Sequence, residues 1–255
     1  MQDDSEILFG IRTVTADAKF GLRINGVSTK LKGGCIHHDN GLLGAVSVYD
    51  VEYRKVKKLK ESGFNAIRTA HNPPSEDFLE VCDRLGMYVF DEAFDTWGMG
   101  KQPGDYHMFF DKDWREDLEA FVKRDRSRPS VIMWSTGNEI TERGGLNNGY
   151  TLAGELVSAV KELDATRPVS NAICGLWSGL DIQLTLESQK KLQETMEGDS
   201  FGIQNADPDR DDLEWEKRTE AFANGLDIVG YNYLEEKYEQ SHEMYPDRVI
   251  LGSEN

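Results

Sequence analysis

The sequence predicts an α/β fold, an incomplete (β/α)₈ TIM barrel preceded by the end of a β-sandwich domain. Two observations predict it. From about residue 30 onward, short β-rich runs alternate with amphipathic helical patterns, as in repeated βα units around a parallel sheet. Most of these runs have an apolar centre and end in polar or glycine-containing sequence, as strands buried on both faces do. The length of 255 residues allows one such barrel or two smaller domains, and the order of the motifs favours the barrel.

Seven barrel strands are predicted, each a short apolar run with polar or turn-forming flanks. They are expected at Thr29–His37, Asn65–Thr69, Met87–Glu92, Val131–Gly137, Pro168–Ile173, Asp227–Tyr231 and Val249–Ser253. Apolar residues at helical spacing predict helices between them. These are expected at Val51–Glu61, Phe78–Arg84, Trp114–Arg126 and Leu152–Leu163.

The segments outside these βα units carry separate expectations. Ile7–Val14 predicts a strand, and Phe20–Ile24 followed by Asn25-Gly26 predicts a hairpin turn. We therefore assign residues 1–26 to the end of a preceding β domain and its linker, and residues 27–255 to the barrel. Ser178–Leu226 has no clear strand and predicts a partly helical surface insertion, with a lid over the site as the alternative. Because the sequence ends just after the seventh strand, we expect the barrel to be truncated, without its eighth strand.

Composition limits the partners. Forty-six acidic residues against 29 basic ones give a formal charge of −17, which disfavours binding to nucleic acid or to anionic membranes and leaves neutral ligands such as sugars unopposed. No apolar run is long enough to span a membrane. The three cysteines (Cys35, Cys82 and Cys174) are scattered and predict buried thiols, neither a disulfide framework nor a zinc site. The compartment stays open between the cytoplasm and the periplasm of a bacterium.

Two glutamates mark the ends of predicted strands, where catalytic residues of this fold lie. Glu139 follows the fourth strand and Glu254 the seventh. As a pair across one barrel mouth, one could protonate a leaving oxygen while the other attacks an anomeric carbon, as in retaining glycosidases. Two other classes of protein are alternatives to a glycosidase. A non-catalytic carbohydrate-binding barrel predicts a missing carboxylate, and neither is missing.

The other alternative is a metal-dependent barrel hydrolase, suggested by His37-His38-Asp39 after the first strand and by His71 after the second. Adjacent residues of a strand point to opposite faces, so His37 and His38 are poorly placed to bind one metal ion together. We therefore predict no metal ligands from the residue pattern.

Four motifs carry a family resemblance that extends over about residues 30 to 255. They are the run from Arg124 to Glu139 (RDRSRPSVIMWSTGNE), Asn65–Pro74 (NAIRTAHNPP), Phe90–Phe94 (FDEAF) and Ile228–Tyr233 (IVGYNY). They resemble motifs of the β-galactosidases of glycoside hydrolase family 2. Asn72 stands where the family pattern has tyrosine. In that family the barrel follows an immunoglobulin-like domain, so the resemblance assigns residues 1–26 to the end of such a domain.

The resemblance implies roles for the catalytic pair and its neighbours. It makes Glu139 the general acid/base and Glu254 the nucleophile. It places Asn138 at the sugar 2-hydroxyl and a tyrosine hydroxyl beside the nucleophile. That tyrosine is Tyr233 by resemblance, but the spacing alone does not separate it from Tyr231.

Further substrate contacts follow from the same motifs. His71 is expected to contact a sugar hydroxyl, and Arg68 to lie beneath the carboxylates as a cation. Asp91 and His37 are expected at the substrate as well. Trp97 and Trp177 are candidate stacking platforms for a pyranose ring, with core packing as the equal alternative.

The resemblance also implies a reaction. We expect a retaining exo-β-glycosidase that hydrolyses terminal β-D-galactosides by double displacement, with β-glucuronidase and β-mannosidase as alternatives that share the barrel and both glutamates. The expected partner is a carbohydrate, and a homo-oligomeric parent protein stays open. The residue pattern requires no cofactor, although magnesium or sodium near the site is compatible with the family.

Overall fold

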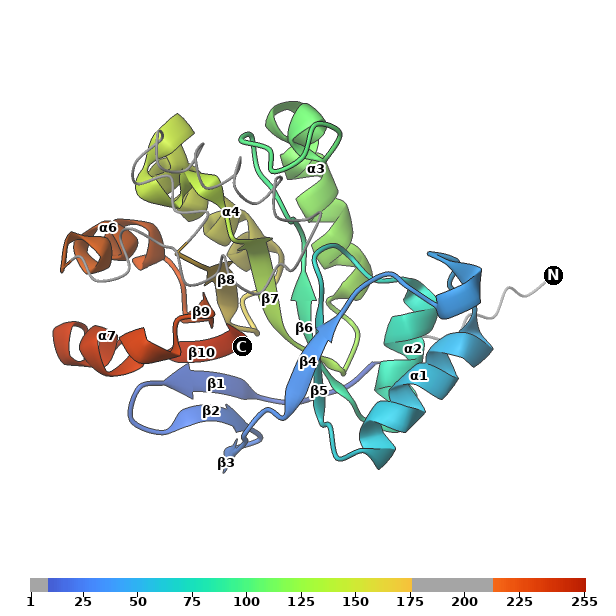
Figure 1. Cartoon of the computed structure of the whole chain (residues 1–255). Helices are drawn as coiled ribbons and strands as arrows, with labels where there is room; N and C mark the ends of the chain where they lie inside the picture. The colour runs from blue at the N-terminus through green and yellow to red at the C-terminus, as the bar shows by residue number, and fades with distance from the viewer. Residues whose placement is uncertain (1–8, 176–212) are drawn as a thin grey trace.

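The computed structural model describes residues 9–175 and 213–255. Their centre is a parallel sheet of seven strands, curled into most of a barrel and covered by helices on its outside (Figure 1). The strands are β4 (Gly33–Ile36), β5 (Ala66–Thr69), β6 (Tyr88–Glu92), β7 (Val131–Asn138), β8 (Val169–Ile173), β9 (Ile228–Asn232) and β10 (Ile250–Glu254). They pair in sequence order from β4 to β10. This confirms the predicted incomplete barrel and all seven of its strands.

The helices follow the strands in the expected alternation. They are α1 (Tyr49–Glu61), α2 (Glu76–Leu85), α3 (His107–Asp125), α4 (Gly149–Leu163), α6 (Leu213–Ala223) and α7 (Tyr238–Met244), with short 3₁₀ turns η1 (Gly41–Leu43), η2 (Thr141–Gly144), η3 (Leu146–Asn148) and η5 (Glu235–Lys237). Local chemistry sets the ends of α2. The Ser75 hydroxyl accepts a hydrogen bond from the Phe78 amide at its start. At its end Gly86 adopts a left-handed conformation with φ of 67°.

Two helices differ from the sequence-based expectation. α3 begins at His107 and not at Trp114, because its first turns expose Met108 and Phe109 and so break the apolar period. α7 was not predicted, because its short polar sequence shows no apolar stripe.

The predicted surface insertion, Ser178–Leu226, is wrong at its carboxyl end. That end forms α6, and its residues Phe222 and Ala223 are buried in the main core. The helical character was expected, but the few apolar residues of this short polar helix did not indicate that it packs on the core. Trp177 and the rest of the predicted insertion lie outside the described residues.

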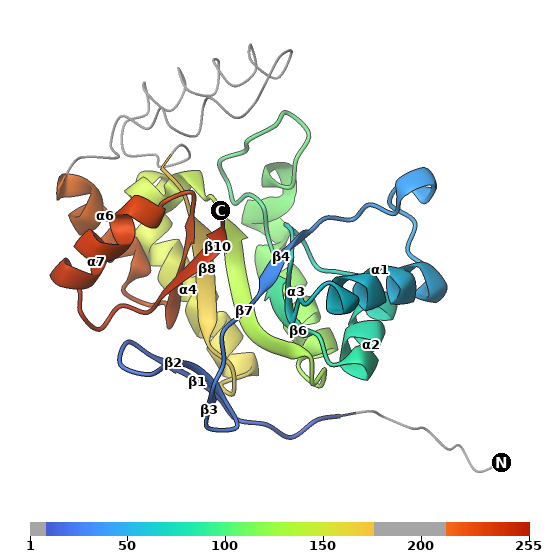
Figure 2. The ribbon, with the colours of Figure 1, turned by 60° about the horizontal axis from the view of Figure 1, so that its bottom comes forward.

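A small antiparallel sheet of β1 (Val14–Asp17), β2 (Gly21–Ile24) and β3 (Val27–Ser28) lies beneath the barrel, opposite the carboxyl ends of its strands (Figure 2). Ile24 packs there with Phe90 and Ile132 in a second apolar cluster. The strand predicted from Ile7 is wrong within the described residues, since β1 begins only at Val14. The assignment of residues 1–26 to a preceding domain stays a prediction.

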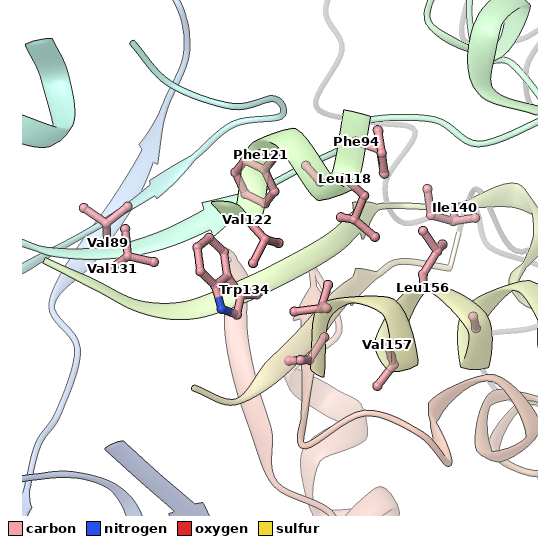
Figure 3. Close-up of a cluster of buried hydrophobic side chains, with 14 of the residues drawn as sticks. Val89, Phe94, Leu118, Phe121, Val122, Val131, Trp134, Ile140, Leu156 and Val157 are labelled. Carbon is pink, nitrogen blue, oxygen red and sulfur yellow. The ribbon is translucent and has the colours of Figure 1, made fainter. Parts of the chain in front are cut away.

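The main core lies between the sheet and the helices outside it (Figure 3). Trp134 of β7 is fully buried, and its ring meets that of Phe121 from α3 edge to face at 5.2 Å. Its indole nitrogen donates to the Asp164 carboxylate at 3.0 Å, so the one polar atom of the ring has a partner. Replacing such a side chain with alanine typically costs about 3–5 kcal/mol. This packing holds β7 rigidly, and β7 carries Glu139 at its end.

The barrel is open between its two edge strands, β4 and β10. A cleft of about 750 Å³ lies between them and reaches Glu254 and Tyr233. Cys82 and Cys174 are buried, Cys35 is half-buried on the cleft, and all three are free thiols. Within residues 9–175 and 213–255, none of the helices combines the length and hydrophobicity of a membrane span.

Candidate active site

The carboxyl ends of β7, β9 and β10 bring two glutamates to one amide group. The side-chain nitrogen of Asn232, at the end of β9, lies 3.1 Å from Oε1 of Glu139 and 3.3 Å from Oε2 of Glu254. The pairing of β10 with β9 shifts register at Ser253, and Ser253 in turn donates to the Asn232 side-chain oxygen at 2.7 Å. Register shifts of this kind re-aim side chains next to active sites. The structure thus brings the two sequence-predicted carboxylates together.

Left-handed backbone explains how adjacent residues reach the same site. Consecutive strand residues point to opposite faces. Glu139, directly after Asn138, has φ of 48°, and Tyr233, directly after Asn232, has φ of 56°. This turn of the backbone lets each asparagine and its successor both face the barrel mouth. It also separates the two tyrosines: the Tyr233 hydroxyl donates to Oε1 of Glu254, whereas the Tyr231 hydroxyl bonds to Ser241.

Glu254 is surrounded by donors and cations. Besides Tyr233 and Asn232, the Arg68 guanidinium donates to its Oε2 at 3.1 Å, and Nε2 of His71 lies 3.7 Å from the same oxygen. The side chain is about a quarter exposed. Donors and a fixed positive charge favour the ionised form of a carboxyl group.

Glu139 has the opposite surroundings. Burial raises the pKa of its carboxyl group, and the negative charge of Glu254 adds to the rise, while Lys101 and the Asn232 hydrogen bond oppose it. A raised pKa keeps a carboxyl group protonated at a higher pH, which a general acid requires. The two glutamates of the site therefore lie in contrasting surroundings.

Glu92, at the end of β6, anchors the floor of the site, and sequence reasoning missed it. Its carboxylate accepts from Arg68 at 2.8–3.0 Å, from His71 Nδ1 at 2.7 Å and from Ser135 at 2.8 Å. Burial by itself would raise its pKa, but Arg68, His71 and Ser135 outweigh burial and lower the pKa to about 2. Glu92 therefore holds Arg68 and His71 in place beneath Glu254.

Asn138 is already bonded on both sides of its amide. Its oxygen accepts from Arg68 at 2.7 Å and from Asn232 at 3.0 Å, and its nitrogen donates to Asp95 at 2.9 Å. These bonds fix its orientation. Asn232 is the second residue that sequence reasoning missed. It belongs to the Ile228–Tyr233 motif, in which only the tyrosines on either side of it were predicted as site residues.

Two expected substrate contacts are wrong. Asp91 is fully buried on the outer face of β6, where it contacts Thr69, and burial together with Asp125 raises its pKa. Alternation along the strand sends Glu92 inward and Asp91 outward. Trp97 has no exposed surface, so it is a core residue and not a stacking platform. Its indole donates to the Thr136 carbonyl at 3.0 Å, and its ring stacks on Phe110.

His37 lies at the edge of the site. Its exposed ring meets the ring of His71 edge to face at 5.1 Å. His38 lies apart, with its Nδ1 atom 3.2 Å from the Asn72 side-chain nitrogen. The two histidines therefore do not converge on one point, as the alternation of strand residues predicts.

Comparison with known proteins identifies the family. Residues 17–197 match the family model described as "Glycosyl hydrolases family 2, TIM barrel domain". The chain belongs to glycoside hydrolase family 2. Among curated relatives of this family 2 chain, "Beta-galactosidase BoGH2A" of Bacteroides ovatus is 41% identical over 191 residues, which cover 63% of the chain and 22% of that protein. A "Putative beta-glucuronidase" of Formosa agariphila is 37% identical and covers 71% and 17%.

A solved structure agrees. A family 2 member from Bacteroides cellulosilyticus is 42% identical, with a TM-score of 0.76 over 100% of this chain and 29% of that chain. The family 2 chain thus spans 17–29% of the length of these relatives.

Among the described residues of this family 2 chain, the donors at the site do not fit a metal ion. Within residues 9–175 and 213–255, no three His, Cys, Asp or Glu side chains gather as metal ligands would. Asp95, a carboxylate beside Asn138, has its Oδ1 atom bonded to the Lys101 ammonium at 2.8 Å. A fixed positive charge at that oxygen repels a second cation.

Proposed function

We propose that this chain carries the catalytic centre of a retaining exo-β-glycosidase that removes terminal β-D-galactosyl groups. The observation that carries the proposal is the unequal pair around Asn232. Glu254 lies among donors that favour its charge, and burial raises the pKa of Glu139. A nucleophile needs surroundings that favour its charge, and a general acid needs a raised pKa.

The spacing of the pair supports retention of configuration. Oε1 of Glu139 and Oε2 of Glu254 lie 3.1 and 3.3 Å from the side-chain nitrogen of Asn232. The distance between these two oxygens therefore cannot exceed the sum of the two values. Inverting enzymes need about 6.5–9.5 Å between their carboxyl groups to admit a water molecule, and retaining enzymes about 5–5.5 Å. The geometry favours direct attack by a carboxylate.

The reaction then proceeds in two steps. In the first, the Glu254 carboxylate bonds to the anomeric carbon, the glycosidic C–O bond breaks, and Glu139 gives its proton to the leaving oxygen. In the second, Glu139 takes a proton from a water molecule whose oxygen bonds to the anomeric carbon, and the bond to Glu254 breaks. Arg68 and Tyr233 stabilise Glu254 when it leaves as a carboxylate.

The choice of sugar rests on two points. One relative named a beta-galactosidase is 41% identical and others of that name are 32–34% identical, while relatives named as beta-glucuronidases are 37% and 32% identical. At the site, Arg68 already binds Glu92 and Glu254, and Lys101 binds Asp95. Within the described residues these pairings leave neither cation for the carboxylate of a uronic acid, which supports a neutral sugar.

The test is a panel of aryl β-galactoside, β-glucuronide and β-mannoside substrates with the full-length protein, followed by trapping. We expect the galactoside to have the highest kcat/KM, and a 2-deoxy-2-fluorogalactosyl fluoride to label the peptide that contains Glu254. Preference for the glucuronide would overturn the sugar assignment. A label on another carboxylate would overturn the mechanism.

A further inference from the structure

A lysine that sequence reasoning did not single out lies beside the catalytic pair. Lys101 belongs to the loop between β6 and α3, and its side chain is about 9% exposed. Its ammonium donates to the Asp95 carboxylate at 2.8 Å and to the Asn138 main-chain carbonyl at 2.9 Å. Asn138 directly precedes Glu139, so the positive charge lies one residue from the general acid.

The loop is built to hold this lysine in place. The Asp105 carboxylate accepts from the main-chain nitrogens of Lys101 and Gln102, both at 2.7 Å, and from that of His107 at 3.0 Å. It also accepts from the Thr96 hydroxyl at 3.3 Å. One carboxylate thus ties both ends of the loop to the start of α3, which limits the positions open to the Lys101 side chain.

Asp95 completes the arrangement. The same Oδ1 atom that accepts from Lys101 accepts from the Asn138 side chain at 2.9 Å. Lys101 and Asp95 therefore clamp Asn138 from its main chain and its side chain. This ion pair is partly exposed on the Asp95 side, so its own contribution to folding stability is small. Its importance lies in where it places a charge.

We propose that Lys101 is the resident cation on the Glu139 side of this active site: it positions the Asn138-Glu139 pair and sets the proton affinity of Glu139, so that no metal ion is needed there. The proposal rests on the proposed function and deepens it. Glu139 must release a proton in the first step and take one up in the second, which requires a pKa that is raised but not extreme. Burial and Glu254 raise the pKa of Glu139, and Lys101 is the first of the influences that lower it.

Two substitutions of opposite sign test the proposal through the pH dependence of kcat/KM, whose alkaline limb reports the general acid. Lys101→Met keeps the aliphatic stem and removes the charge. We expect the pKa of Glu139 to rise and the alkaline limb of the profile to shift to higher pH by about one unit. Asp95→Asn removes the negative charge that balances Lys101, so the alkaline limb should shift to lower pH.

Matched controls separate charge from structure. Lys112→Met removes an exposed lysine on α3 and should leave the profile unchanged. Thermal unfolding of each variant identifies any that fail to fold. Wild-type activity should survive exhaustive chelation and should not rise on addition of Mg²⁺.

Three outcomes would overturn the proposal: a limb that stays in place in both substituted proteins, movement of both in the same direction, or loss of wild-type activity on chelation with recovery on Mg²⁺. The absence of turnover on every glycoside in the wild-type protein would count against the proposed function itself. The two failures are therefore distinguishable.

Discussion

The ends of β7 and β10 carry the same residue type in contrasting settings. All eight residues of β7 are buried, with β6 and β8 paired on either side. β10 is an edge strand with partly buried residues, and it ends at the cleft beside β4. Burial raises the pKa of Glu139 at the first strand end, whereas cations and donors surround Glu254 at the second. Position in the sheet, and not residue type, gives the two carboxyl groups their contrasting surroundings.

The largest expected effect comes from replacing Glu254, the proposed nucleophile. Glu254→Gln keeps the shape of the side chain but cannot form the glycosyl ester. We expect kcat to fall on the order of 10⁴–10⁶-fold and covalent labelling by a 2-fluoro sugar to disappear. Mass spectrometry of the labelled protein checks this. Stoichiometric labelling of the Gln variant would show that another residue is the nucleophile.

A smaller, substrate-dependent effect is expected at Glu139, the proposed general acid. Glu139→Ala removes the proton donor, which typically contributes about 10²–10⁴-fold. Galactosides with poor leaving groups should lose that much, while activated aryl galactosides should keep their rate in the first step because their leaving group needs no proton. Pre-steady-state measurement of phenol release checks the difference. Equal losses on both substrate types would argue against general acid catalysis.

The smallest expected effect concerns stability, and it compares Glu139 with Glu92. The folded-state pKa of Glu92 is about 2, below its ordinary value, so its charge stabilises the fold above about pH 4.5, and this contribution is lost as the pH falls toward 2. It amounts to about 3 kcal/mol. Glu139 has the opposite sign, because its pKa is raised and its contribution is lost as the pH increases.

Glu92→Gln tests this linkage. We expect the variant to be less stable than the wild type at pH 6, and the difference to narrow as the pH approaches 3. Urea unfolding at the two pH values measures it, and Glu80→Gln, on the exposed face of α2, serves as the control. A difference that stays constant with pH would mean that folding does not shift the pKa of Glu92.

The barrel could be predicted from the sequence because parallel strands that are buried on both faces consist of consecutive apolar residues, as in Val131–Trp134. Glu139 and Glu254 follow two of these strands, and the resemblance to glycoside hydrolase family 2 distinguished them from other acidic residues near strand ends. Asp91 and Glu92 show the limit. Both are acidic and adjacent, and only the register of β6 with its neighbours decides which one points inward.

Long-range contacts explain the other residues that were missed or misjudged. Asn232 matters because β9 lies between β7-β8 and β10, which no local pattern reveals. Lys101 lies in a loop whose shape depends on Asp105. Trp97 looked like a stacking platform because it follows a strand end, but contacts with Phe110 and Phe222 bury it.

The left-handed residues after β7 and β9 have a consequence for protein engineering. A regular strand presents every second side chain to a given face, so one strand end normally supplies one functional group. Here Asn138-Glu139 and Asn232-Tyr233 each supply two, because the second residue of each pair has a positive φ. Left-handed backbone costs a non-glycine residue about 1–2 kcal/mol, and β-branched side chains tolerate it least. A designer who wants a dense polar site in a barrel could adopt this arrangement, choosing an unbranched residue for the second position and accepting a small loss of stability.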